Sequence, residues 1–286
     1  MTDEGRTVTT WDYFLLFCDD GSTIAGAIGR NRHGAEVWLT AYGDRPLTIF
    51  RHFPARTFKR RPRGVSLHRN FLRVYRDSLC VRVAEDGIDL LVSAQSPLAG
   101  PEDDIAWAGP AGQVRWRLSC LRAKFGGRLV VNGVARRISG TMFHDTVSHN
   151  LPIDSLSFLK DFRYWTWGWL VGQVTTALFV DVAYGPAPFR FLIVDGPDGT
   201  VARGPEIDGE AFGLTGDKAH PHQSIIIAPG RDQLSIRLDR HYPVQHGVGS
   251  LGRLAYRLFR PKYHSVGEFR GRGDRGIAYV ESFRLR

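Results

Sequence analysis

The segment HDTVSHN, at residues 144–150, holds two histidines and one aspartate within a few positions. An apolar, strand-like run precedes it, and an aromatic stretch with Tyr164, Trp165, Trp167 and Trp169 follows. Such residues can transfer protons, bind a metal ion or form a polar turn. The residue types leave these three interpretations open, and the spacing narrows them.

A metal site is the least favoured of the three interpretations. His144 and His149 are five positions apart, which is not the helical i, i+4 pair. On a strand an odd separation places two side chains on opposite faces, so only a turn could bring the rings together. We therefore predict no metal ligands here.

General acid–base chemistry suits the segment better. A carboxyl group among aromatic rings loses hydration, which would raise the pKa of Asp145 and let it hold a proton near neutral pH. A neighbouring histidine could orient this carboxyl group or relay its proton. The faces of indole and phenol rings could stabilise a developing cation. These parts suit protonation of an alkene or an allylic oxygen. The simpler interpretation is that Asp145 caps a turn and the tryptophans fill a core.

Signatures of other chemistries are missing from the sequence. It contains no GxxxxGK[ST] phosphate loop and no GxSxG elbow. GRGDRG at 271–276 is glycine-rich but lacks a strand–loop–helix context, so we expect a flexible loop there. Cys18, Cys80 and Cys120 lie far apart in apolar segments and are predicted to be buried thiols.

Short strands that are rich in β-branched and aromatic residues make up most of the chain. Turn residues separate these strands at 19–21, 31–34, 86–87 and 132–133. The sequence VVNGVA has the form of a hairpin with Asn-Gly at its centre, and CDDGST is a second hairpin candidate. In VRWRLSCL, basic and apolar residues alternate, which predicts a strand with outward-facing arginines. The pattern indicates an antiparallel sandwich or barrel.

The second half of the chain repeats this pattern of short strands separated by turns. Residues 164–184 are predicted to form a strand pair or one bent strand, and a hairpin is expected around residues 196–199. Two short helices are predicted, at 154–161 and 248–259. One set of strands is complete near residue 150, so we place the boundary between two domains, 1–152 and 153–286.

Positive charge is concentrated in parts of the chain, whose net charge is +9. Residues 51–63 hold six Arg or Lys and no acid, and residues 105–144 hold seven and no acid. Such segments favour an anionic partner, such as a lipid headgroup layer. No nucleic-acid-binding signature accompanies them, so we expect no nucleic-acid partner. No run of 18 apolar residues and no apolar signal region is present, which predicts a cytoplasmic protein. The basic segments would allow it to make peripheral contact with anionic membrane.

Several segments together resemble the hydroxyneurosporene synthase family, or carotenoid 1,2-hydratases. They are TWDYFLLFCDDGSTIAGAIG, ISGTMFHDTVSHNLP, DFRYWTWGWLVG, YHSVGEFRGRGD and AYVESF. Gly140, Phe143, His144 and Asp145 match the central motif of the family. Without a gap, Thr146 to Ser148 stand where the family has His-Asn-Trp; with a short insertion, His149-Asn150 take the place of the His-Asn pair.

The resemblance implies an all-β fold of two consecutive lipocalin-like β-domains of the barrel or sandwich type, with few short helices. This clan also contains tocopherol cyclases and natural-product cyclases, and its chemistry needs no cofactor. Asp145 would protonate an apolar alkene, with His144 as its orienting partner. His149 would be a second acid–base group under the insertion alignment. Tyr164 would act beside them. The predicted substrate-binding residues are Trp11, Tyr13, Phe143, Trp165, Trp167 and Trp169.

The sequence therefore predicts a cofactor-independent hydratase or cyclase of an isoprenoid or another natural-product alkene. Two alternatives stay open. A pericyclic cyclase or isomerase would need a shaped cavity more than an acid. A non-catalytic isoprenoid or lipid carrier would bind the same hydrophobic molecules and dock on anionic membrane.

Overall fold

The chain folds as two compact units, Met1–Leu151 and Pro152–Arg286, in a computed structural model. The sequence placed this division after residue 152. The structure describes residues 9–43, 46–98, 104–109, 112–151, 162–184, 188–196, 199–203, 212–215, 224–227, 234–243, 263–271 and 273–284.

The described part of the chain is all-β, as predicted, apart from one short 3-10 turn, η1 (Ala55–Thr57). The first unit contains β1 (Thr9–Cys18), β2 (Thr23–Asn31), β3 (Gly34–Tyr42), β4 (Leu47–Phe53), β5 (Phe58–Arg61), β6 (Gly64–Leu67), β7 (Asn70–Val74), β8 (Ser78–Glu85), β9 (Ile88–Leu98), β10 (Ile105–Gly109), β11 (Gly112–Val131) and β12 (Val134–His149). The second contains β13 (Phe162–Gly172), β14 (Thr176–Tyr184), β15 (Pro188–Gly196), β16 (Gly199–Arg203), β17 (Phe212–Thr215), β18 (Ser224–Ile227), β19 (Leu234–Pro243), β20 (Tyr263–Gly271) and β21 (Asp274–Arg284). Both predicted helices lie outside the described residues.

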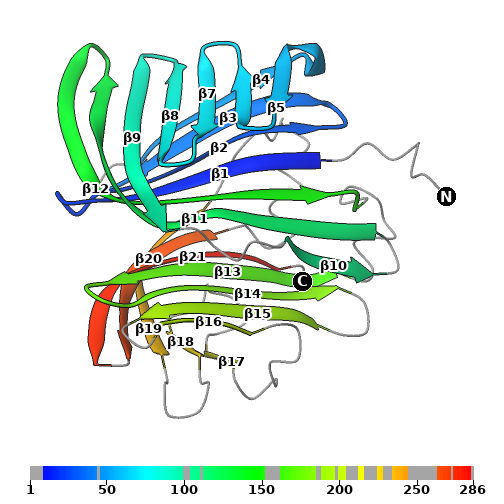
Figure 1. Ribbon diagram of the computed structural model, residues 1–286, viewed down its shortest axis with the longest axis vertical. Coiled ribbons are helices and arrows are strands. Elements are labelled where there is room, and N and C mark those ends of the chain that lie inside the picture. Colours follow the sequence, from blue (N-terminus) through cyan, green and yellow to red (C-terminus); the bar gives the residue numbers. More distant parts are fainter. Residues whose placement is uncertain are drawn as a thin grey trace. The chain divides into compact units, whose positions relative to one another are not determined.

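One curled antiparallel sheet forms the first unit. Its strand order is β4-β3-β2-β1-β12-β11-β9-β8-β7-β6-β5, and β10 pairs with β11. The short hairpins β5 to β8 curl over β2 and β3 (Figure 1), where β6 and β7 approach β2. The curl encloses an apolar core that includes Phe14, Leu16 and Met142. Each strand therefore has an inner face toward this core and an opposite outer face.

The second unit repeats this arrangement with fewer strands. Its order is β16-β15-β14-β13-β21-β20-β19-β18-β17. In both units the first strand pairs with the last strand, β1 with β12 and β13 with β21. Leu170, Phe179 and Val280 belong to the core of this second sheet. The two units therefore share one topology, although their sequences show no close repeat.

The predicted turns are confirmed where positive φ angles are required. Asn132 and Gly133 have φ of 50° and 84° between β11 and β12, and Asp86 and Gly87 have φ of 52° and 78° between β8 and β9. Two successive positive φ angles match the twist of the flanking strands, which explains the preference for Asn-Gly and Asp-Gly. The strand pair predicted over 164–184 is β13 with β14.

The alternation predicted for VRWRLSCL is confirmed in β11. Arg115 and Arg117 are exposed, whereas Val114, Trp116 and Leu118 between and beside them are buried. The strand thus turns its apolar side chains away from solvent.

The flexible loop predicted at 271–276 is instead largely a hairpin. Gly271 pairs with Asp274 at the end of β20 and the start of β21. The Asp274 carboxylate accepts backbone N–H bonds from Val174 (3.0 Å) and Thr175 (2.8 Å), which ties the hairpin to the turn between β13 and β14. These bonds hold the pKa of Asp274 below its usual value against the opposing effect of its partial burial.

All three cysteines carry free thiols. Cys18 and Cys120 are buried, as predicted, whereas Cys80 is only half-buried. Burial raises the pKa of Cys18 to about 11 and that of Cys120 to about 12, so both thiols stay protonated near neutral pH. No helix in the described part of the chain is long and apolar enough to span a membrane.

Candidate active site

The segment HDTVSHN is neither a turn nor a loop, because it forms the end of strand β12 as far as His149. β1 pairs with it on one side and β11 on the other. Extended backbone sends successive side chains to opposite faces of the sheet. His144 and Thr146 therefore share the inner face with the core residue Met142, while Asp145 and His149 share the outer face.

Asp145 is a buried carboxyl group on the outer face, with only 1% of its surface exposed. Tyr13 of β1 and Leu118 of β11 are its direct neighbours across the sheet. The indole Nε1–H of Trp116, on β11, donates to Asp145 Oδ2 over 2.5 Å. This bond orients the carboxyl group, and a buried carboxyl needs such a donor to offset its lost hydration.

Several aromatic side chains lie on the same face of the sheet as Asp145. The ring of Tyr13 meets that of Trp38 edge to face, with centroids 5.4 Å apart. Trp11 lies against Gly29 of β2, where any Cβ atom would overlap the indole ring. Phe143 is fully buried on the same face of β12. Trp11, Tyr13 and Phe143, all predicted from the sequence, thus share a face with Asp145.

His144 belongs to a different cluster, on the inner face. Its Nε2 lies 3.8 Å from Asp12 Oδ1, and neither ring nitrogen has a hydrogen-bond partner among the described residues. Asp12 also accepts from the Thr146 hydroxyl (3.0 Å) and pairs with Arg60 of β5. The expectation that His144 orients Asp145 is therefore wrong, because adjacent strand residues point to opposite faces.

His149 lies near the end of β12, opposite Thr9 and Val114. Burial lowers its pKa from 6.5 to about 4, and its Nδ1 has no hydrogen-bond partner in the described part of the chain. The ring is therefore neutral at pH 7. The structure places His149 on the same face of the sheet as Asp145, with Val147 between them. Its role as a second acid–base group stays a prediction.

We expect the pKa of His149 to make folding stability fall in mild acid. The folded pKa lies below the unfolded value, so the unfolded chain binds more protons between pH 6.5 and about 4. The stabilising contribution is complete above pH 6.5 and is lost as the pH falls toward 4, by about 3 kcal/mol. Urea unfolding of wild type and His149→Gln at pH 7 and pH 4.5 measures it. A wild-type loss between these pH values no larger than that of the variant would contradict this assignment.

In the second unit, β13 carries the aromatic residues predicted from the sequence. Trp165, Trp167 and Trp169 alternate with the core-facing residues and lie on the outer face, where Trp167 contacts Tyr279 with ring centroids 5.6 Å apart. Trp167 and Trp169 are buried. These three tryptophans thus form one aromatic surface in the second unit.

Tyr164 faces the opposite way. Its hydroxyl donates to both oxygens of Asp181 (3.2 and 3.3 Å), and Arg190 Nε donates to Asp181 Oδ1 (3.0 Å). Burial, and secondly the Asp181 charge, raise the pKa of Tyr164, so its phenol stays protonated. Tyr164 and the tryptophans of the same aromatic stretch therefore lie on opposite faces of β13, because an even position on this strand faces the core side. The predicted role of Tyr164 beside Asp145 stays a prediction.

The structure also shows a buried pair that the sequence analysis missed. His264 Nε2 lies 2.9 Å from Glu281 Oε2, and His264 and Glu281 are 0% and 7% exposed. Glu281 lies five residues after Gly276, just as Asp145 lies five residues after Gly140. Gly140 pairs with the last residue of β1, and Gly276 pairs with the last residue of β13. Single acidic residues within apolar runs, such as Asp12, Asp181 and Glu281, are the signal that could have revealed these clusters.

A metal centre finds no support in the described residues, because they contain no group of three or more potential ligands.

The sequence analysis grouped Asp145 and the tryptophans in one substrate-binding site. These residues belong to different units, and their common placement stays a prediction.

Comparisons with known proteins identify the fold. The sequence matches no protein-family model and no curated protein. A solved structure described as an AttH of Nitrosomonas europaea is 11% identical, with a TM-score of 0.64 and coverage of 100% of this chain and 95% of that chain. Kievitone hydratase from Nectria haematococca is 12% identical, with a TM-score of 0.62 and coverage of 96% and 88%.

A third solved structure, CghA with Sch210972, is 12% identical, with a TM-score of 0.66 and coverage of 98% of this chain and 89% of that chain. At such identities the likeness shows a shared lipocalin-like β fold, and a fold does not by itself determine a function. The resemblance to carotenoid 1,2-hydratases in particular stays a prediction.

Proposed function

We propose that this protein is a cofactor-independent hydratase or cyclase that acts on an apolar isoprenoid or another natural-product alkene. The observation that carries the proposal is Asp145, a buried carboxyl group that is oriented by Trp116 and shares a face of the sheet with aromatic rings. The shared fold with a hydratase is consistent with it. In this proposal the substrate contacts Trp11, Tyr13 and Phe143, which share a face of the sheet with Asp145.

Asp145 acts as the general acid in this reaction. Its O–H bond breaks and a C–H bond forms at one alkene carbon, which leaves a carbocation at the other. The negative faces of the aromatic rings stabilise this cation without reacting with it. Water or an internal nucleophile then forms the new bond to the cation. Hydration returns a proton to the Asp145 carboxylate, so water is added overall and no redox cofactor is needed.

An indole N–H is a suitable partner for Asp145 as the proposed general acid. The Trp116 indole can donate a hydrogen bond but cannot accept one, so it holds the carboxyl group without taking its proton. Burial of Trp116, Leu118 and Phe143 keeps bulk water away from this face. Exclusion of water protects a carbocation from premature capture and strengthens the electrostatic effect of the rings.

The test is proton transfer from solvent to carbon. Native mass spectrometry of protein from its own host identifies the bound small molecule, which then serves as the substrate or leads to it. Turnover in D₂O is expected to place one non-exchangeable deuterium on carbon in each product molecule, because the Asp145 proton exchanges with solvent.

Three other outcomes would contradict the proposal. A rearranged product without deuterium on carbon would favour a pericyclic cyclase. Tight binding of the molecule without turnover would favour a carrier. Protein that carries no ligand and binds no apolar probe would remove the basis for a substrate cavity.

A further inference from the structure

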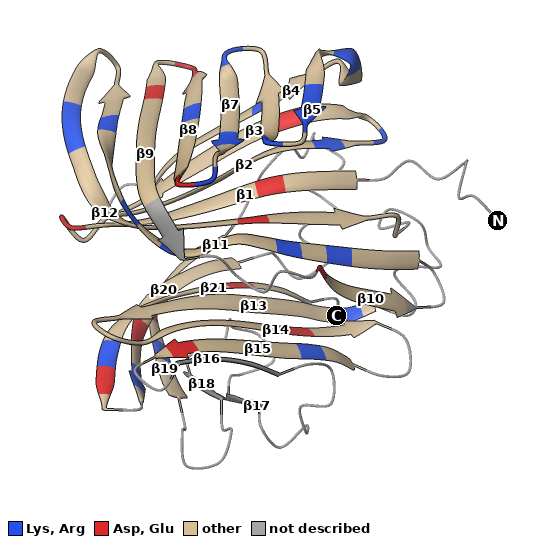
Figure 2. Ribbon diagram, viewed as in Figure 1, with Lys and Arg blue, Asp and Glu red and all other residues tan. Residues whose placement is uncertain are grey.

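Basic residues dominate one edge of the first unit. Residues 51–76 contain nine Arg or Lys and no Asp or Glu. This segment forms β4 to β7 together with η1, and β5 is the last strand at its end of the sheet. Figure 2 shows basic residues along β5 and β7, and acidic residues at the turn between β8 and β9.

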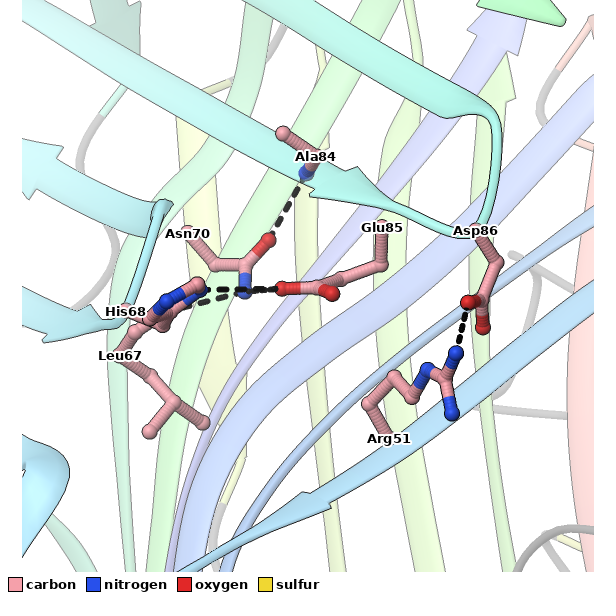
Figure 3. A network of polar contacts seen from close by, with 7 residues as sticks. All are labelled: Arg51, Leu67, His68, Asn70, Ala84, Glu85 and Asp86. Atoms are coloured by element: carbon pink, nitrogen blue, oxygen red, sulfur yellow. Dashed lines mark hydrogen bonds and ion pairs between the residues drawn. The ribbon is translucent and has the colours of Figure 1, made fainter. Parts of the chain in front are cut away.

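At one end of these hairpins the charges are balanced. Arg51 pairs with Asp86, and His68 Nδ1 lies 3.8 Å from Glu85 Oε1 (Figure 3). Asn70 connects the same turn, since its amide donates to Glu85 (2.8 Å) and its oxygen accepts from the backbone N–H of Ala84 (2.8 Å). The acids of the β8–β9 turn therefore neutralise this end.

At the other end the charges are not balanced. The β5–β6 and β7–β8 turns lie side by side there, because the N–H of Val74 donates to the carbonyl oxygen of Arg63 (2.9 Å) and Gly64 pairs with Arg73. Arg61 pairs with Gly64 from the other side. Together with Arg76, these exposed arginines form what we call the basic rim: Arg61, Arg63, Arg73 and Arg76.

None of the four rim arginines pairs with a carboxylate in the described residues, although Asp77 adjoins Arg76 in sequence. The guanidinium group of Arg73 instead lies over the ring of Phe71, 4.6 Å from its centroid. Beside the rim, Tyr75 is 42% exposed on the β7–β8 turn. Four exposed guanidinium groups create a local positive field beside the Tyr75 ring, and an anionic partner would reduce their mutual repulsion.

We propose that the basic rim docks this protein on an anionic lipid surface. Each arginine close to such a surface gains attraction from the negative headgroups. A tyrosine can place its ring at the boundary between acyl chains and headgroups while its hydroxyl stays in water. Single-stranded nucleic acid is usually bound along a groove with several stacking rings. Beside this rim the exposed ring is that of Tyr75 at a turn, and the Phe71 ring is covered by the Arg73 guanidinium group. The proposal does not depend on the reaction of Asp145.

Vesicle flotation of the full chain tests the location of the surface. The probes are phosphatidylcholine vesicles with and without phosphatidylserine, at low and high salt. One variant changes all four rim arginines to glutamine. The matched control removes the same four charges from arginines that are paired with acids: Arg51, Arg82, Arg117 and Arg136.

We expect the wild type to bind only the anionic vesicles, and salt to weaken this binding. The rim variant should bind at least ~100-fold more weakly, from about 1 kcal/mol per arginine, and the paired-arginine control should bind nearly as well as wild type. Tyr75→Ser alone should weaken binding several-fold. Thermal unfolding confirms that each variant is folded.

Equal loss in both four-charge variants would overturn the proposal, because net charge and not the rim would then decide. Equal binding of the wild type to neutral vesicles would overturn it as well. Binding of an oligonucleotide without binding of anionic vesicles would replace the lipid surface with nucleic acid.

Discussion

Asp145→Asn is expected to lower kcat by about 10²- to 10⁴-fold while KM stays close to the wild-type value. Asparagine has the same shape, and its amide oxygen can accept the Trp116 indole N–H that now binds Asp145 Oδ2. It cannot supply an acidic proton. The loss should therefore appear in the chemical step and not in substrate binding. Steady-state turnover of the ligand identified from the native protein measures both constants.

Asp12→Asn is the matched control for this variant. Asp12 is as buried as Asp145, at 2% against 1%, but it lies on the inner face of β1 and pairs with Arg60. If catalysis takes place on the outer face, Asp12→Asn should lower stability and leave kcat nearly unchanged. Retention of kcat within a factor of about three by Asp145→Asn would show that Asp145 is not the acid, since removal of a general acid costs far more.

The burial of Trp116 could be predicted from the sequence, but its contact with Asp145 could not. The alternation in VRWRLSCL correctly placed Trp116 on the buried side of β11. Its contact with Asp145 depends on the register of β11 against β12, which includes irregularities between Leu118 and Cys120 and between Cys120 and Ala123. Such irregularities follow from packing across the sheet, so local residue patterns do not reveal them.

Strand parity explains why neighbouring residues of the predicted site separate. In a turn, the side chains of His144 and Asp145 could converge. In an extended strand the adjacent Asp145 must point to the other face. The same rule separates Tyr164 from Trp165. The partners that the structure supplies, such as Arg60 for Asp12 and Arg190 for Asp181, come from other strands and are selected by the fold.

The all-β fold could be predicted from the sequence because the turns between strands have a distinctive residue composition. The turns at Asp86-Gly87 and Asn132-Gly133 require positive φ angles, and few residues other than glycine, asparagine and aspartate tolerate them. Hairpins between short β-branched strands lead to an antiparallel meander. The same meander occurs twice in this chain, which pairs the first strand with the last in each unit and places Asp145 and Glu281 at corresponding positions.

Asp181→Ala is expected to reduce the free energy of unfolding by about 3–5 kcal/mol. Asp181 is 1% exposed and accepts bonds from Tyr164 and Arg190, whose side chain is 15% exposed. Alanine would leave the Arg190 charge and the Tyr164 hydroxyl largely buried without their acceptor. Urea unfolding at pH 7 measures the loss.

Asp239→Ala tests whether this loss comes from burial and not from the removal of any ion pair. Asp239 also faces an arginine, Arg240, at 3.8 Å, but its side chain is 59% exposed. An exposed pair contributes at most about 1 kcal/mol, so this variant should be nearly as stable as wild type. Equal losses for Asp181→Ala and Asp239→Ala would contradict the argument from burial.

The double variant Asp181→Leu/Arg190→Met separates the cost of an uncompensated charge from the value of the pair itself. A buried pair gains Coulomb energy but loses hydration, so replacing both partners by apolar residues of similar size is often neutral or stabilising. We therefore expect the double variant to be more stable than Asp181→Ala. In the double variant Tyr164 is the polar member of this cluster that remains, and its hydroxyl no longer has Asp181 as an acceptor. If the double variant is as unstable as Asp181→Ala, the cluster stabilises the second unit through the Asp181–Tyr164 bond and not through charge.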